Sequence, residues 1–187
     1  MNLQLDLTLA KVVHEQFDDY LQSEVLFWPV GVVAGLQLPQ LTIGTWLESE
    51  WRLSLLAPAV PELAEARATV RKVRGRIGEP YQLKTRREFK SRIDSWTMFL
   101  DEALEKAAKR ASGDVESPSG YYTSAVHNRF KLELLKNDSS QLQDQLQRLN
   151  TLDMRLKGRL TAADFVWEAE LKPGAPKETF WWLWGRL

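Results

Sequence analysis

Cysteine is absent from this chain of 187 residues, and histidine occurs only as His14 and His127. The absence of cysteine excludes disulfides, zinc–thiolate sites, iron–sulfur clusters and a cysteine nucleophile. His14 and Asp18 would share one face of a helix. Neither histidine has a Glu or His at the spacing that di-iron bundles use, and a metal site needs three or four converging ligands. The sequence therefore predicts neither a metal ion nor a cofactor.

Long apolar segments and targeting signals are also missing. The longest apolar stretch spans residues 25–36, and Pro29, Gly31 and Gly35 interrupt it. It is shorter than the roughly 18–20 residues that cross a bilayer. The first residues contain no basic segment ahead of an apolar one, so no signal peptide is visible. We therefore expect a soluble, cytoplasmic protein with no membrane contact.

Sequence motifs for catalysis are lacking too. The chain contains no Gly-x-Ser-x-Gly nucleophile elbow and no glycine-rich phosphate loop. Its 25 acidic residues are too many to pair into an acid–base site from sequence alone. No catalytic residue can be assigned, and the sequence favours a function based on binding over an enzymatic one.

Apolar residues at helical spacing are what the chain does have. They predict helices over about residues 8–27, 41–57, 61–77, 85–111, 121–136 and 140–160. Pro61 suits a first helical turn, and Thr85 with Glu88 fits a capping box that would begin the fourth helix. Residues 30–40 show no clear period and are expected to form a buried loop or crossover.

These segments together predict the fold class. The sequence indicates an all-α bundle of about six to seven helices with antiparallel neighbours, in one domain covering residues 1–187. The last two long helices should form an antiparallel hairpin because their connection is short. Ser112 to Gly120 is polar and rich in Ser and Gly, so it predicts an exposed loop and a candidate subdomain boundary.

Charge is distributed unevenly, although the net charge is zero. Residues 1–66 carry a net charge of −7, residues 67–92 carry +8, and residues 93–187 carry −1. If the third and fourth helices packed antiparallel, their basic residues would gather near one turn and could bind an anion or a nucleic acid. The alternative is a solvated polar face. The candidate residues are Arg71, Arg74, Arg76, Lys84, Arg86 and Arg87.

The C-terminus holds the least ordinary feature, because four of the five residues from Phe180 to Trp184 are aromatic. An aromatic segment must be covered to avoid aggregation. It would either pack against its own bundle, which we favour, or form an interface with a second copy or another protein, since Trp is a frequent hot-spot residue. The interface candidates are Phe180, Trp181, Trp182 and Trp184.

Three hypotheses for function follow from these patterns. The first is a non-enzymatic structural or protein-interaction module, which could be homodimeric. The second is nucleic-acid binding through residues 67–92, ranked below a protein partner because no base-reading motif is evident. The third is a helical bundle that binds or hydrolyses a small molecule at a site that the sequence does not place.

Overall fold

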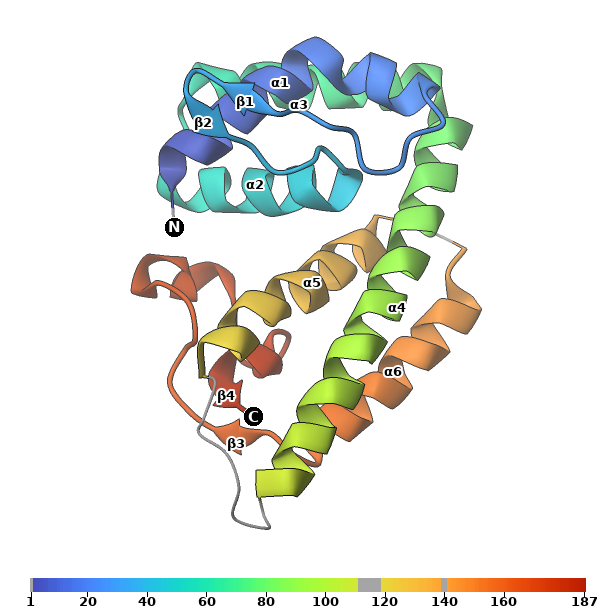
Figure 1. Cartoon of the computed structure of the whole chain (residues 1–187). Coiled ribbons are helices and arrows are strands. Elements are labelled where there is room, and N and C mark those ends of the chain that lie inside the picture. Colours follow the sequence, from blue (N-terminus) through green and yellow to red (C-terminus); the bar gives the residue numbers. More distant parts are fainter. Residues whose placement is uncertain (1, 111–118, 139–140) are drawn as a thin grey trace. The chain divides into compact units, whose positions relative to one another are not determined.

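The computed structural model describes residues 2–110, 119–138 and 141–187, and it confirms the all-α prediction. Six α-helices, two short 3₁₀-helices and two small two-stranded sheets make up the regular structure of these residues (Figure 1). The chain divides into two compact units. Unit 1 comprises Met1–Glu88 and Asn137–Ser140, and unit 2 comprises Phe89–Lys136 and Gln141–Leu187.

Unit 1 contains three complete helices, α1 (Leu3–Gln22), α2 (Ile43–Leu56) and α3 (Pro61–Arg76), and the beginning of α4 (Gly78–Arg110). Its core is built from the apolar stripes of these helices. A buried Val, Leu or Phe side chain contributes about 1.5–3 kcal/mol relative to an exposed one. The largest buried core residues of the first three helices include Leu9, Val13, Phe17, Tyr20, Trp46, Leu53, Leu63 and Val73.

Polar contacts between helices show how the helices of unit 1 run. Lys11, His14 and Asp18 of α1 contact Glu62, Thr69 and Arg76 of α3, respectively. The residue numbers rise together, so α1 and α3 are parallel. Helix α2 lies beside both and runs in the opposite direction (Figure 1). The unit is therefore an up-down-up arrangement of three helices.

The first helix begins and ends earlier than the predicted 8–27. Asn2 caps it, because its side-chain oxygen accepts hydrogen bonds from the backbone N–H groups of Gln4 at 3.1 Å and Leu5 at 3.4 Å. The prediction of a buried loop over residues 30–40 was wrong. Strands β1 (Val32–Val33) and β2 (Leu36–Gln37) pair there as a hairpin. Of residues 30–40, only Leu38 is buried, and most of the others are exposed.

The predicted start of the fourth helix at a Thr85–Glu88 capping box was also wrong. Helix α4 begins at Gly78, so both residues lie inside it. The Thr85 hydroxyl donates to the Tyr81 carbonyl at 2.8 Å. Glu88 instead stabilises the start of α2, because its carboxylate accepts hydrogen bonds from the Thr42 hydroxyl at 2.6 Å and from the Gly44 N–H at 3.0 Å. Such acceptors satisfy donors left free at a helix N-terminus.

Unit 2 combines the rest of α4 with α5 (Ser119–Asn137) and α6 (Gln143–Lys157). Asp94 and Asp101 of α4 bind Arg148 and Arg155 of α6, so these two helices are parallel. Helix α5 runs antiparallel to α4, because Arg92 contacts Asn128 while Glu102 contacts Tyr121. Helices α5 and α6 form the antiparallel hairpin predicted from their short connection, and unit 2 is again up-down-up (Figure 1).

The C-terminal segment of unit 2 has little regular structure. Strands β3 (Thr161–Ala162) and β4 (Gly185–Arg186) pair antiparallel, and the 3₁₀-helices η1 (Ala169–Gly174) and η2 (Trp181–Trp184) lie between them in sequence. Gly185 has a structural reason to be glycine, since a Cβ atom there would lie 2.4 Å from Cγ of Leu160.

Two predictions about organisation are not decided by these observations. The single domain over residues 1–187 stays a prediction, and most of the proposed boundary loop at residues 112–120 lies outside the described residues; its last two residues belong to α5. Within the described part of the chain, no helix combines the length and apolar content needed to cross a bilayer.

Candidate functional site: a pocket lined by arginine in unit 1

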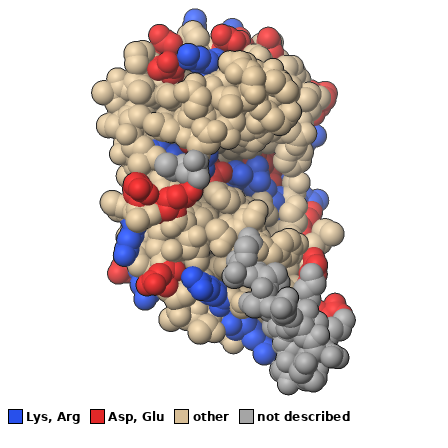
Figure 2. Space-filling model, turned by 60° about the vertical axis from the view of Figure 1, so that its left-hand side comes forward, with Lys and Arg blue, Asp and Glu red and all other residues tan. Residues whose placement is uncertain are grey.

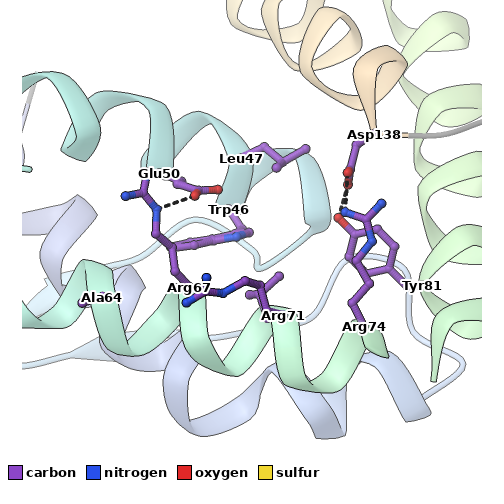
Figure 3. A pocket seen from close by; sticks show the side chains of 10 residues that line it. Trp46, Leu47, Glu50, Ala64, Arg67, Arg71, Arg74, Tyr81 and Asp138 are labelled. Atoms are coloured by element: carbon purple, nitrogen blue, oxygen red, sulfur yellow. Dashed lines mark hydrogen bonds and ion pairs between the residues drawn. The ribbon is translucent and has the colours of Figure 1, made fainter. Parts of the chain in front are cut away.

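A pocket of about 610 Å³ opens between α2 and α3 of unit 1 (Figure 3). Helix α2 contributes one wall and α3 another, while Tyr81 of α4 and Asp138, which follows α5, complete it. The lining residues are Trp46, Leu47, Glu50, Ala64, Arg67, Val70, Arg71, Arg74, Tyr81 and Asp138.

Helix α3 presents three arginines to this pocket. Arg67, Arg71 and Arg74 lie four and three residues apart, so they project from one helix face. Arg67 donates from Nε to Glu50 at 2.7 Å and from Nη2 to the Ser54 hydroxyl at 2.6 Å. The pair with Glu50 comes from neighbouring helices and fixes the Arg67 guanidinium against α2 (Figure 3).

Arg74 is held at the opposite end of the row. Its Nη1 donates to Asp138 Oδ1 at 2.6 Å, and its guanidinium lies over the Tyr81 ring, 4.6 Å from the centroid. The Tyr81 hydroxyl donates to the second oxygen of Asp138. Burial, followed by the negative charge of Asp138, raises the pKa of Tyr81 far above its ordinary value. Tyr81 therefore stays protonated and acts here as a hydrogen-bond donor.

Arg71 differs from the arginines on either side of it. Among the residues that the structure describes, it has no hydrogen-bond or ion-pair partner, and its side chain is exposed at the pocket. All five of its N–H donors are therefore available to a ligand, and their planar arrangement matches the two oxygens of a carboxylate. Trp46, Leu47 and Val70 supply apolar surface beside it.

The structure distributes the predicted basic patch over several local contacts. Arg76 binds Asp18, Arg86 binds Glu79 at 3.1 Å, and an Arg87 nitrogen lies 4.0 Å from the Glu24 carboxylate. Figure 2 shows Lys and Arg side chains interspersed with Asp and Glu on the face that it presents. Helix α4 begins at Gly78, directly after α3 ends at Arg76, and only its first part, up to Glu88, belongs to unit 1.

Lys84 is buried, although it was predicted as a member of the patch. Its ammonium donates to the Val25 carbonyl at 2.5 Å and to the Ser23 hydroxyl at 3.2 Å, and it lies 4.2 Å from the centroid of the Tyr20 ring. Desolvation by burial, and then the positive charge of Arg87, lower the pKa of Lys84 to about 8. Lys84 thus holds the segment that follows α1 through Ser23 and Val25, and its ammonium is not available to a ligand. Binding of a nucleic acid to residues 67–92 stays a prediction.

The aromatic residues at the C-terminus belong to unit 2. Phe180 and Trp182 are buried, whereas Trp181 and Trp184 keep part of their surface exposed. Phe180 packs on Phe130 of α5 with ring centroids 5.1 Å apart. The hydroxyl of Tyr122 donates to the Trp182 carbonyl at 2.7 Å. The role of this segment as an interface stays a prediction.

An ion-pair network lies directly beneath Trp182. The Arg129 guanidinium is 3.6 Å from the centroid of the Trp182 ring. It donates to both carboxylate oxygens of Asp153, at 2.9 and 2.7 Å, and to Glu133 at 3.1 Å. Lys136 also binds Glu133, at 2.7 Å. Three of the N–H donors of Arg129 are thus bound to carboxylates within unit 2.

The two histidines lie in different units, His14 in unit 1 and His127 in unit 2. His14 Nδ1 lies 3.0 Å from the Thr69 hydroxyl, and His127 stacks on Trp167 with ring centroids 4.4 Å apart. No group of three or more His, Asp or Glu side chains that could hold a metal ion occurs in the residues that the structure describes.

Several residues of the pocket were not identified from the sequence as site residues. Trp46 belongs to an apolar stripe of α2, and it is buried and also lines the pocket. Glu50 and Asp138 carried no signal of their own, because their significance depends on arginines that are distant in sequence. Only Arg71 and Arg74 were predicted as anion-binding residues and also line the pocket.

Comparison with known proteins adds no relative. No protein family, no curated protein and no solved structure matches this chain.

Proposed function

We propose that the chain is a binding protein and that unit 1 holds a small organic anion in the pocket between α2 and α3. The observation that carries this proposal is the Arg71 guanidinium. It lines a pocket and has no partner among the described residues, while the arginines on either side of it are held by Glu50 and Asp138.

The size and composition of the pocket support a ligand with both an apolar and an anionic part. A volume of about 610 Å³ lies within the range of about 300–1,000 Å³ that is common for small-molecule sites. The apolar part of the ligand would contact Trp46, Leu47 and Val70. Its anionic group would accept two hydrogen bonds from Arg71, the geometry that arginine favours with carboxylates.

Titration calorimetry with 1-naphthaleneacetate as the probe tests the proposal. We expect saturable binding to the intact chain and a loss of affinity of about 10- to 100-fold in Arg71→Met, the equivalent of a charge-assisted hydrogen bond of about 1.5–3 kcal/mol. Lys72→Met is the matched control, because Lys72 is exposed on the same helix but does not line the pocket. No binding, or equal affinity in both variants, would contradict the proposal.

Self-association is a second candidate function, favoured by the partial exposure of Trp181 and Trp184 at the C-terminus. A second copy could cover these rings, as Trp side chains often do at interfaces. Analytical ultracentrifugation at high micromolar concentration tests it. A dimer gives a mass near twice 21.5 kDa that falls toward the monomer value in Trp184→Ala, whereas a monomeric mass for the unchanged chain rejects this candidate.

A further inference from the structure

The charges that line the pocket nearly cancel. Arg67, Arg71 and Arg74 contribute three positive charges, and Glu50 and Asp138 contribute two negative ones. The net charge of the lining is therefore +1, although three arginines face it. A ligand with one negative charge would leave the occupied pocket neutral.

The two carboxylates are fixed in place by their partners. Glu50 binds Arg67 at 2.7 Å, and Asp138 binds Arg74 at 2.6 Å while it accepts a hydrogen bond from Tyr81. Each carboxylate thereby takes up one flanking guanidinium, and each repels a second negative charge brought to Arg71. Only Arg71 remains as a cation whose charge is not compensated within the pocket.

The desolvation cost of an ion rises roughly with the square of its charge, whereas its attraction to a fixed positive charge rises only in proportion to the charge. A phosphate monoester carries about −1.5 to −2 at pH 7 because its second pKa is near 6. Taking such a group out of water therefore costs far more than taking out a carboxylate, and a lining of +1 does not repay the difference.

We propose that this pocket selects amphipathic monocarboxylates and rejects the corresponding phosphate dianions, with Glu50 and Asp138 as the residues that set the selection. This inference rests on the proposed binding of an organic anion and names its chemical class. The aromatic and aliphatic wall formed by Trp46, Leu47 and Val70 accepts the body of the ligand, and Arg71 accepts its single charge.

The test compares two probes that share one aromatic body, 1-naphthaleneacetate and 1-naphthyl phosphate, by calorimetry at pH 7.5. We expect the carboxylate to bind about tenfold more tightly or better, the equivalent of one logarithmic unit in Kd. The difference should shrink at pH 5, where the phosphate is mainly a monoanion.

Two variants that remove a negative charge make the test independent of folding defects, because they are expected to gain binding. In Glu50→Gln and in Asp138→Asn the affinity for 1-naphthyl phosphate should rise about tenfold relative to that for 1-naphthaleneacetate, since a second guanidinium becomes available. Glu65→Gln is the control, because Glu65 is exposed on α3 and does not line the pocket; its preference should equal that of the unchanged chain.

The possible results separate the two proposals. If neither probe binds, the proposed function itself fails. If both bind with similar affinity and both depend on Arg71, the pocket binds anions but the selection is overturned. A preference for the phosphate, or no change of preference in Glu50→Gln and Asp138→Asn, also overturns the selection and leaves anion binding intact.

Discussion

A buried arginine of unit 2 contrasts with an exposed arginine of unit 1. Unit 2 encloses Arg129 between two carboxylates and covers it with Trp182. Unit 1 has an arginine of the same kind, since Arg52 binds Asp6 at 2.6 Å and Glu48 at 3.1 Å, but its Arg71 is exposed and has no partner among the described residues. A guanidinium enclosed by carboxylates stabilises the fold of its own unit, whereas the Arg71 guanidinium of unit 1 is available to bind a ligand.

The largest effect should separate the two arginines. We expect Arg129→Met to lower the free energy of unfolding by about 3–5 kcal/mol, because it leaves two carboxylates without their buried partner. Arg71→Met should change it by less than about 0.5 kcal/mol, since it removes an exposed side chain with no described partner. Urea denaturation followed by circular dichroism measures both. Equal losses would show that the contrast between Arg129 and Arg71 is wrong.

The next effect concerns Glu88, a buried carboxylate of unit 1. Glu88→Ala should cost about 1–3 kcal/mol, because the Thr42 hydroxyl and the Gly44 N–H lose their acceptor at the start of α2. Glu88→Gln keeps one acceptor oxygen and should cost less. Glu79→Ala, at an exposed position of α4, serves as the control in the same denaturation experiment. A Glu88→Ala variant as stable as the control would mean that α2 needs no acceptor from α4.

A pair of glycines extends the comparison to packing. Gly185→Ala in unit 2 should cost about 1–3 kcal/mol, because the new Cβ atom would overlap Leu160 and the fit is already tight. Gly75→Ala in α3 of unit 1 meets nothing within 4 Å, and it should add up to about 1 kcal/mol by improving helix propensity. Thermal unfolding of both variants measures whether the two substitutions change stability in opposite directions. A stabilised Gly185→Ala variant would contradict the close approach of a Cβ atom at this position to Leu160.

The smallest expected effect is a pH dependence of the free energy of unfolding, which Lys84 of unit 1 causes. The folded state lowers the pKa of Lys84 to about 8 from an ordinary value of 10.5. Between these values the unfolded chain binds more protons, so stability contributed by this group increases as the pH rises from about 8 toward 10.5.

The measurement is the free energy of unfolding at pH 7.5 and at pH 9.5 in the unchanged chain and in Lys84→Met. The free energy of unfolding of the unchanged chain, relative to that of Lys84→Met, should be larger at pH 9.5 than at pH 7.5. Arg87→Met, which removes the nearby positive charge, should reduce the shift in pKa and with it the slope. Parallel pH profiles for the unchanged chain and Lys84→Met would show that Lys84 keeps its ordinary pKa.

The sequence predicted the helices best where the signals are local. The third helix was expected over about 61–77 and spans Pro61–Arg76, because a proline at its first turn and an apolar stripe act within the segment itself. The predicted capping box at Thr85 and Glu88 was wrong because the interaction that Glu88 makes is not local. The same two residue types occur inside a longer helix, and the Glu88 carboxylate serves a helix that begins 45 residues earlier in the chain.

The candidate site was only partly predictable. The basic character of residues 67–92 was visible, and it includes the Arg71 and Arg74 that line the pocket. Which arginine lacks a partner could not be read from the sequence, because Arg74 is neutralised by Asp138 and Arg76 by Asp18, far away along the chain. The sequence also could not place the apolar wall, since Trp46 fits a core stripe and its position at the pocket depends on how α2 packs against α3.

The parallel pairing of α1 with α3 also sets the order in which unit 1 can form. Contacts such as those between His14 and Thr69, 55 residues apart, and between Asp18 and Arg76, 58 residues apart, close long loops. The entropy of closing them is lost before any contact is gained, so unit 1 should fold more slowly than its helix content suggests. During synthesis at roughly 5–20 residues per second, several seconds pass between the synthesis of the apolar stripe of Leu9, Val13 and Phe17 and that of helix α3.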